Sequence, residues 1–273
     1  MKNFIKKKFP LIFNLYSKSP FYRRKLLQNK LLEINAKKLQ IAKEAEILSS
    51  VFNNQLVVQN GPFEGMRYIN KSSCSTLLPK ILGSYEEPIQ PWIEEIINSN
   101  KYLRILDIGC AEGYYACGFG FTLPEIEIIG YDIDPEARKS AAELKSINNL
   151  KNVKIKSECT SEELNNQCDP GTLVFCDIEG FEDTLLDPIK SPNLKNADIL
   201  VESHDFYIPN LTDSLISRFY LTHKMRIIID YPYRLKQYSS KNLFSTDQFS
   251  FIVDEKRPPF MKFIFMENNY GKV

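Results

Sequence analysis

From about residue 101 onward, short apolar runs alternate with helix-length amphipathic segments, an alternation typical of a parallel sheet built from strand–helix–strand units. The clearest unit covers residues 103–135. There an apolar run ends at Asp107, a glycine-bearing turn and a helix-length segment follow, and a second apolar run ends at Asp132. Such a unit binds its ligand where the strands end.

The same pattern continues to the C-terminus and predicts a doubly wound α/β sheet. One helix opens at Asp134-Pro135, with a proline in its first position. Apolar runs predict further strands at 153–157, 172–178, 198–202, 225–230 and 261–267, and periodic segments predict helices at 135–147 and 209–222.

The N-terminal region predicts a different structure, a long helix over much of residues 1–54 that starts at Ser19-Pro20. Its apolar positions recur at steps of four and three, broken only by Lys38. They are Leu27, Leu31, Ile34, Ile41, Ala45 and Leu48. This stripe leaves two interpretations open, a helix packed on its own domain or a short coiled coil that forms a homodimer.

A hairpin is expected at 56–69, with its turn at Asn60-Gly61. The expected organisation is therefore a basic helical extension at 1–55, a hairpin and a lid with its helix at 56–100, and an α/β core at 101–273.

Charge divides the chain unevenly, although the formal net charge is only +1. Residues 1–30 hold nine Lys or Arg and no acid, which leaves 26 basic against 34 acidic residues in the remainder. Lys6-Lys7-Lys8, flanked by phenylalanines, leaves open a peripheral contact with an anionic membrane surface. An acidic body without a nucleic-acid module argues against a nucleic-acid partner.

Six cysteines without a C-x-x-C pair favour reduced, mostly buried thiols. No apolar run is long enough for a membrane-spanning helix, and the N-terminal apolar piece is too short for a signal peptide. We therefore expect a cytoplasmic protein, with the inner face of the membrane open as a peripheral location.

The glycine turn excludes a dinucleotide site. Gly109 and Gly113 frame the turn, but Ala111 stands where the G-x-G-x-x-G pattern has its middle glycine. Asp132, at the end of the next strand, has a carboxylate that can accept both hydroxyls of a ribose. The two features together indicate a nucleoside ligand.

These residues resemble the class I S-adenosylmethionine-dependent methyltransferases, with DIGCAEG similar to the first motif and YDIDP to the second. The resemblance implies a seven-stranded sheet with helices on both faces and the last strand antiparallel. It also implies contacts with the methionine end of the cofactor from Asp107, Gly109, Cys110, Ala111 and Gly113. Asp132 and Ile133 are expected at the ribose and Cys159 at the adenine, and Asp177 is a further expected cofactor contact.

A finer resemblance concerns the segments before and after this turn. GPFEGMRYI and LLPKILGSYEEPIQPWIEEII resemble the segment that precedes the core in FkbM-type methyltransferases, and DIEGFE at 177–182 resembles their D-x-E-G-x-E signature. The resemblance implies that Ser84, Tyr85 and Glu86 form a lid over cofactor and substrate. The alternative is that Tyr85 and Glu86 cap the helix that follows.

Candidate chemistry lies at two strand ends. Asp177 and Glu179 are one residue apart, and alternate residues of a strand face the same side. His204 ends the next strand, whereas His223, in a polar THK triplet, is expected on the surface. In one mechanism His204 or Glu179 is the general base that deprotonates a substrate hydroxyl.

In a second mechanism Asp177, His204 and Asp205 hold a divalent cation, and Glu179 is the base. The spacing is similar to that of the magnesium-binding acids of macrocin-type sugar O-methyltransferases, with His204 in place of one acid. Magnesium prefers oxygen ligands, so manganese or no metal is equally consistent with this set.

The segment 231–260 is rich in aromatic and basic residues that suit a sugar ring and an acid group. The predicted function is O-methylation of a saccharide or sugar-linked precursor in surface polysaccharide synthesis. The alternatives are methylation of a small non-sugar metabolite, or a catalytically silent cofactor-binding scaffold.

Overall fold

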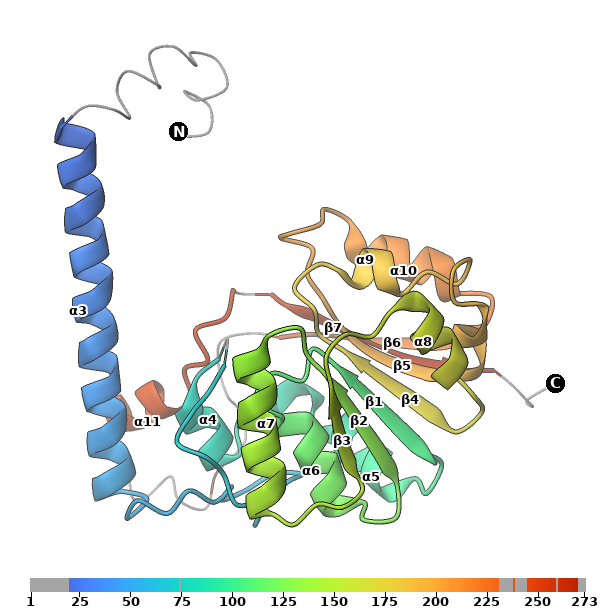
Figure 1. Cartoon of the computed structure of the whole chain (residues 1–273), viewed down its shortest axis with the longest axis horizontal. Coiled ribbons are helices and arrows are strands. Elements are labelled where there is room, and N and C mark those ends of the chain that lie inside the picture. The colour runs from blue at the N-terminus through green and yellow to red at the C-terminus, as the bar shows by residue number, and fades with distance from the viewer. Residues whose placement is uncertain (1–19, 74, 231–237, 239–244, 259, 270–273) are drawn as a thin grey trace. The chain divides into compact units, whose positions relative to one another are not determined.

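A computed structural model describes residues 20–73, 75–230, 238, 245–258 and 260–269 (Figure 1). The chain divides into two units, Met1–Asn54 and Gln55–Val273. The basic Lys6-Lys7-Lys8 cluster, Cys74 and the aromatic residues Tyr231 and Tyr233 lie outside the described residues.

The first unit contains one long helix, α3 (Pro20–Ser50). Four positions of the predicted stripe, Leu27, Leu31, Ile34 and Ile41, are exposed. Further exposed leucines lie off that stripe, at 26, 32 and 39. No described helix is both long and apolar enough to cross a membrane.

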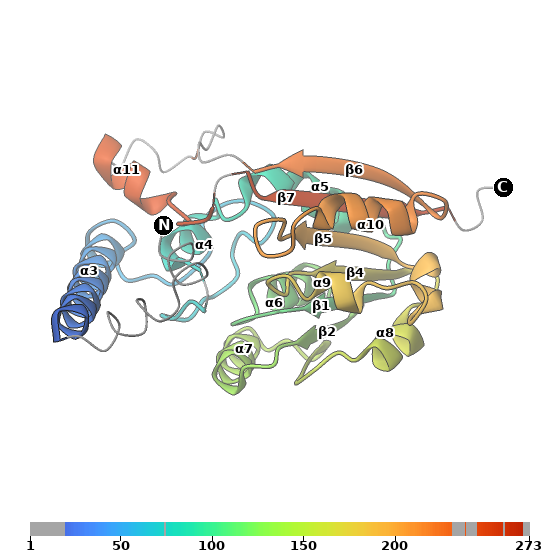
Figure 2. The same ribbon diagram turned by 90° about the horizontal axis from the view of Figure 1, so that it is seen from above.

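The second unit is built on one seven-stranded sheet with the order β3-β2-β1-β4-β5-β7-β6. The strands are β1 (Arg104–Ile108), β2 (Glu127–Tyr131), β3 (Val153–Lys156), β4 (Thr172–Cys176), β5 (Asp198–Ser203), β6 (His223–Ile229) and β7 (Lys262–Asn268). Strand β7 lies between β5 and β6 and is antiparallel to both (Figure 2). The expected fold, with its last strand antiparallel, is confirmed.

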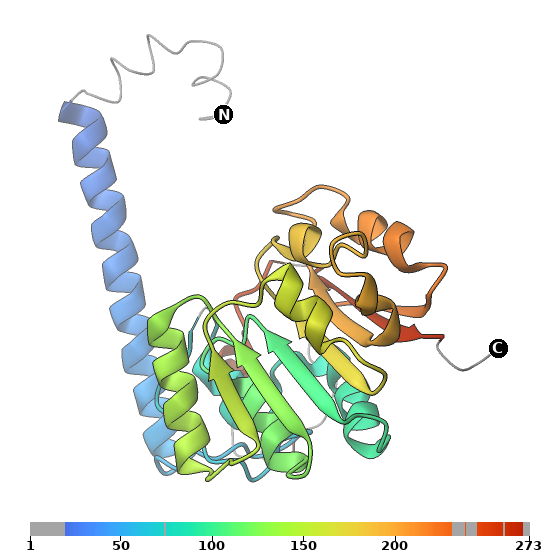
Figure 3. The ribbon, with the colours of Figure 1, turned by 45° about the vertical axis from the view of Figure 1, so that its right-hand side comes forward.

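Helices cover both faces of this sheet, with α5, α6 and α7 on one face and α8, α9 and α10 on the other (Figure 3). Their bounds are α4 (Leu77–Leu82), η1 (Glu87–Ile89), α5 (Gln90–Asn98), α6 (Tyr114–Thr122), α7 (Pro135–Ile147), α8 (Ser161–Gln167), α9 (Glu182–Leu185), η2 (Pro192–Asn196), α10 (Leu211–Phe219) and α11 (Thr246–Ile252). Helix α7 starts as predicted, because the Asp134 side chain accepts the Glu136 N–H at 2.9 Å.

Buried apolar side chains on both faces explain why the central strands read as continuous apolar runs. Leu106, Val174 and Ile199 from adjacent strands pack in one core cluster with Leu164 of α8 and Leu215 of α10. The parallel register aligns Ile108 with Cys176. The carboxyl ends of β1 and β4 therefore meet at one edge of the sheet.

The segment predicted as a hairpin at 56–69 is a short antiparallel pair. It is centred on the bridge Val57↔Arg67, and Val58 N–H donates to Met66 and Tyr68 N–H to Leu56, at 2.9 and 2.7 Å. The segment is also attached to the end of α4, because Gln59 N–H donates to the Ile81 carbonyl and the Asn60 side-chain amide to the Leu82 carbonyl, both at 2.8 Å.

The expectation that His223 is a surface residue is wrong, because the side chain is 3% exposed. Strand β6 begins at His223, two residues before the predicted start, and the ring packs edge-on against Phe219 of α10. His223 Nε2 lies 2.9 Å from the Ala197 carbonyl, which is the polar partner that permits its burial.

Candidate active site

The turn between β1 and α6 has left-handed backbone at three positions, Gly109, Ala111 and Gly113. A Cβ on Gly109 would lie 1.7 Å from the Asp177 carbonyl oxygen, so only glycine permits this approach to the chain after β4. The turn is therefore packed against the segment that carries Asp177.

Asp132 fastens this turn to the end of β2. One carboxylate oxygen accepts the Ala111 N–H at 2.8 Å, and the other accepts the Asp134 N–H at 2.8 Å. Asp132 also lines the cavity described next.

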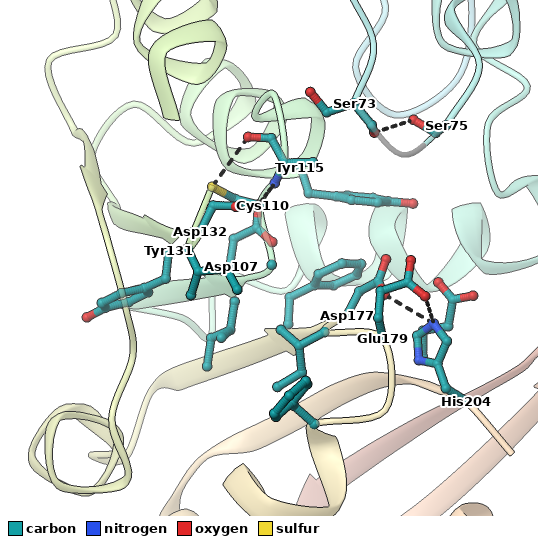
Figure 4. A pocket seen from close by; sticks show the side chains of 18 of the residues that line it. Ser73, Ser75, Asp107, Cys110, Tyr115, Tyr131, Asp132, Asp177, Glu179 and His204 are labelled. Carbon is teal, nitrogen blue, oxygen red and sulfur yellow. Dashed lines mark hydrogen bonds and ion pairs between the residues drawn. The ribbon is translucent and has the colours of Figure 1, made fainter. Parts of the chain in front are cut away.

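A cavity of about 800 Å³ runs along the carboxyl ends of the strands (Figure 4). It brings together most of the residues predicted to hold the cofactor: Tyr85, Asp107, Gly109, Cys110, Ala111, Asp132, Ile133, Cys159 and Asp177. Gly113 and Glu86 do not line it. Gly113 is instead the N-cap of α6, and it packs so closely on α7 that an added Cβ would lie 3.2 Å from the Ala141 Cβ.

The Glu86 side chain is not part of a lid, because it is 1% exposed and does not line the cavity. Its carboxylate accepts a hydrogen bond from the Tyr115 hydroxyl and forms an ion pair with Arg257. The lid prediction failed here because Glu86 has left-handed backbone before η1, which turns the side chain inward. Tyr85 does line the cavity.

Arg257 lies within a cluster of acids. Its guanidinium is 3.1 Å from Glu202 and 3.3 Å from Glu255, in addition to the Glu86 pair. Burial alone would lower the pKa of Arg257, but the charges of Glu86 and its neighbours raise it. Arg257 also lines the cavity, so the predicted contact between the basic residues of 231–260 and an acid group stays a prediction.

Several acids surround the single positive charge of Arg257, and the pKa values of two of them are raised. Burial and the charge of Asp177 hold the pKa of Glu202 well above its usual range. Burial and the charge of Glu86 raise the pKa of Asp177 to about 6. The floor of the cavity is thus acidic and able to hold protons near neutral pH.

Asp177, Glu179 and His204 converge at one edge of the cavity (Figure 4). His204 Nε2 lies 3.5 Å from Asp177 Oδ1 and 3.6 Å from Glu179 Oε2. Asp177 follows β4 and His204 follows β5, and adjacent parallel strands end side by side. The predicted meeting of these three residues is observed.

The reason given for the carboxylate pair needs correction. Strand β4 ends at Cys176, so strand alternation does not govern Asp177 and Glu179. Instead Glu179 and Gly180 both have positive φ, 54° and 100°, and this reversal aims the Glu179 carboxylate back toward His204.

Asp205 is not a member of the group, contrary to the predicted metal set. Its carboxylate accepts the Thr212 N–H at 3.0 Å and pairs with Lys262 at 2.9 Å. The side chain is thus used to fasten the start of α10. Among the described residues, one oxygen or nitrogen ligand from each of Asp177, Glu179 and His204 lies within 4.8 Å of the other two.

Glu182 was missed as a site residue, although it is the last acid of DIEGFE. It is 0% exposed, and its Oε1 lies 2.9 Å from His204 Nδ1. Burial alone would lower the pKa of His204, but the Glu182 hydrogen bond and the charge of Asp177 raise it. Its place as the third acid of the DIEGFE motif could have identified Glu182 as a site residue from the sequence.

Exposed aromatic side chains border the same edge. Phe181 is 69% exposed, and Phe206 and Tyr207 are about half exposed. All three line the cavity, and the Tyr207 ring stacks on His204 with 5.9 Å between centroids. This wall is available to a ring-shaped ligand.

The cavity fits a cationic cofactor such as S-adenosylmethionine. Asp107 Oδ2 is buried without a hydrogen-bond partner among the described residues, although Asp107 lines the cavity. Burial raises the pKa of Asp107 to about 8. A ligand group that donates a hydrogen bond or carries positive charge would satisfy this oxygen.

Comparisons with known proteins found one family model and a set of similar solved structures. A family model described as a methyltransferase domain matches residues 99–248. No curated protein matches the chain. Among solved structures, an O-methyltransferase of tomaymycin synthesis from Streptomyces achromogenes, in complex with S-adenosylmethionine, is 15% identical, with a TM-score of 0.42; the match covers 63% of this chain and 77% of that one.

Two further solved structures are similar at the same level. An S-adenosylmethionine-dependent O-methyltransferase from Thermotoga maritima is 13% identical, with a TM-score of 0.42 and coverage of 65% and 64%. A precorrin-6y C5,15-methyltransferase from Geobacter metallireducens is 12% identical, with a TM-score of 0.43 and coverage of 65% and 89%.

The matched segment includes more than half of the 273 residues, and it contains the glycine turn, Asp132 and the edge formed by Asp177, Glu179 and His204. The chain belongs to the methyltransferase-domain family and is a class I S-adenosylmethionine-dependent methyltransferase.

Proposed function

We propose that this methyltransferase is of the FkbM type and methylates a hydroxyl of a saccharide or sugar-linked small molecule in surface polysaccharide synthesis. The observation that carries the proposal is the convergence of Asp177, Glu179 and His204 beside an exposed aromatic wall. Carboxylates and an imidazole can bind and deprotonate a hydroxyl, and aromatic faces suit the apolar faces of a sugar ring.

The residues proposed to hold the three parts of the cofactor all line the cavity. Cys159 would contact the adenine, Asp132 the ribose hydroxyls, and Asp107 the methionine end beside the Gly109 turn. Bound S-adenosylmethionine supplies a methyl group already activated on a sulfonium. The protein must therefore align the acceptor oxygen and remove its proton, and alignment alone contributes on the order of 7–11 kcal/mol in favourable cases.

Two mechanisms fit the edge. In the first, His204 Nε2 or the Glu179 carboxylate accepts the hydroxyl proton directly. In the second, Asp177, Glu179 and His204 would hold a divalent cation, which would lower the pKa of a bound hydroxyl so that its proton could pass to water at this edge. Two carboxylates and one imidazole suit manganese better than magnesium, which prefers oxygen ligands.

The proposed self-association uses α3. Leu27, Leu31, Ile34 and Ile41 follow steps of four, three and seven residues and are exposed, as the contact face of a two-helix coiled coil would be. We expect Leu31→Glu to convert a dimer to a monomer in light scattering; a monomeric wild-type protein would refute the pairing. Membrane contact through the basic arm, whose residues 1–19 lie outside the described residues, stays a prediction.

The test is cofactor turnover with a panel of nucleotide sugars and sugar lipids, measured as S-adenosylhomocysteine formed. Turnover with a hydroxylated sugar, lost in Glu179→Gln, would support the proposal. Turnover only with non-sugar acceptors would refute the sugar assignment, and cofactor binding without any turnover would favour a scaffold. Addition of EDTA, then of manganese, distinguishes the two mechanisms.

A further inference from the structure

The His204 ring has two nitrogens in different surroundings. Nε2 faces the cavity edge, between Asp177 and Glu179 at 3.5 and 3.6 Å. Nδ1 faces the protein interior, 2.9 Å from Glu182 Oε1. Only Nε2 is therefore directed toward a ligand of the cavity.

The Glu182 carboxylate is fully buried and has few partners. Oε1 accepts the Ile178 N–H at 2.8 Å and contacts His204 Nδ1, while Oε2 has no hydrogen-bond partner among the described residues. No lysine or arginine is within ion-pair distance of it in the described part of the chain. A buried carboxylate with so few partners is stabilised by each hydrogen-bond donor that reaches it. A protonated Nδ1 is such a donor, whereas an unprotonated Nδ1 would direct its lone pair at the negative carboxylate.

The chain reversal at Glu179-Gly180 holds this contact in place. It brings Glu182, the first residue of α9, back beneath Ile178 and toward His204. On the other side Tyr207 stacks on the ring, and its N–H donates to the His204 carbonyl at 2.9 Å. The imidazole therefore has little freedom to rotate and exchange its nitrogens.

We propose that Glu182 is a positioning residue that holds the proton of His204 on Nδ1, so that Nε2 presents its lone pair to the acceptor hydroxyl or to a bound cation. The inference rests on the proposed role of His204, but it applies to both mechanisms. A carboxylate behind a functional histidine commonly fixes the tautomer in this way, and its loss costs about 10–100-fold in metal affinity or activity at metal sites.

The chain provides an internal reference, because His223 has the opposite surroundings. Its Nε2 faces the Ala197 carbonyl at 2.9 Å, so that nitrogen must donate, and its Nδ1 lies 2.9 Å from the Thr222 hydroxyl. The two histidines of the chain should thus be opposite tautomers when both rings are neutral.

The experiment is long-range ¹H–¹⁵N NMR of the ¹⁵N-labelled full chain, at a pH high enough that both rings are neutral, with assignments from His204→Gln and His223→Gln. We expect a protonated Nδ1 in His204 and a protonated Nε2 in His223. A His204 ring protonated on Nε2 would overturn the proposal, whether or not the protein methylates sugars, because no acceptor is needed.

Glu182→Gln provides the second measurement, with Asp183→Asn as its matched control. Asp183 is the next residue, pairs with Arg218 and does not line the cavity. We expect Glu182→Gln to mix or reverse the His204 tautomer and to lower turnover about 10–100-fold, with both unchanged in Asp183→Asn. An unchanged His204 tautomer in folded Glu182→Gln would contradict the assignment.

Discussion

His204 and His223 are equally buried, 2% and 3% exposed, yet their surroundings give them opposite properties. His204 lies among carboxylates at the carboxyl end of β5, and the Glu182 hydrogen bond and the charge of Asp177 raise its pKa against the effect of burial. His223 begins β6 against a backbone carbonyl, and burial lowers its pKa. Neighbouring groups, rather than burial, distinguish a candidate catalytic histidine from a structural one.

The largest expected effect is a loss of turnover when His204, but not His223, is replaced. His204→Ala removes the nitrogen that faces Asp177 and Glu179, so turnover should fall about 10²–10⁴-fold, the usual contribution of a general base. Affinity for S-adenosylmethionine, measured by titration calorimetry, should change little. His223→Gln is the control and should keep its turnover per folded molecule. Equal losses in both variants would break the contrast.

A smaller loss is expected when the surroundings of His204 are made less acidic. Asp177→Asn keeps the shape of the side chain but removes one carboxylate 3.5 Å from Nε2. The variant should lose about 10–100-fold in turnover, because the charge of Asp177 stabilises the imidazolium that forms when His204 accepts the proton, and an opposite charge this close shifts a pKa by about 1–3 units. Steady-state kinetics with the identified acceptor measures this, and wild-type rates would show that Asp177 is dispensable.

For protein stability, by contrast, we expect His223 to be the important histidine. His223→Ala leaves the Ala197 carbonyl without its donor and opens a void, so the free energy of unfolding should fall by about 2–3 kcal/mol. Urea denaturation with matched m-values measures it. The specific activity of the folded fraction should stay unchanged. A variant as stable as wild type would mean that the buried hydrogen bond contributes nothing.

The smallest effect is a difference in pH dependence. Because the folded-state pKa of His223 is lowered, the unfolded chain takes up a proton near its ordinary pKa of about 6.5 while the folded chain does not. The stability contributed by neutral His223 is therefore present above that pH and is lost below it, by at most about 1.4 kcal/mol per pH unit.

Unfolding of wild type and His223→Gln between about pH 7.5 and 5 tests this sign. The advantage of the wild type should shrink as the pH falls. For His204, whose folded pKa is raised, the contribution is instead present below about 6.5 and is lost as the pH rises. A His223 advantage that grows on acidification would contradict the assignment.

The sequence predicted the sheet and the strand-end residues because those depend on local pattern. Apolar runs ending in Asp107, Asp132 and Asp177 place these acids at one edge of a parallel sheet, whatever the details of the loops. The start of α7 at Asp134-Pro135 was likewise predictable, because Asp134 caps the helix and a proline occupies its first position.

What the sequence did not predict depends on contacts between distant segments. Arg257 meets Glu86, 171 residues away, and the aromatic-rich segment gave no sign that this base would pair with acids of the protein itself. His223 looked exposed because its neighbours Thr222 and Lys224 are polar, yet the strand began earlier than its apolar run. Asp205 follows His204 directly, but the start of α10 turns its carboxylate to Thr212 and Lys262.

The most direct test of the account is a crystal structure with S-adenosylmethionine bound. We predict the ribose at Asp132 and the sulfonium methyl directed toward the edge formed by Glu179 and His204, with His204 Nε2 facing the acceptor space. A cofactor whose methyl points away from this edge, or that binds outside the cavity, would contradict the assignment of this edge as the site of methyl transfer.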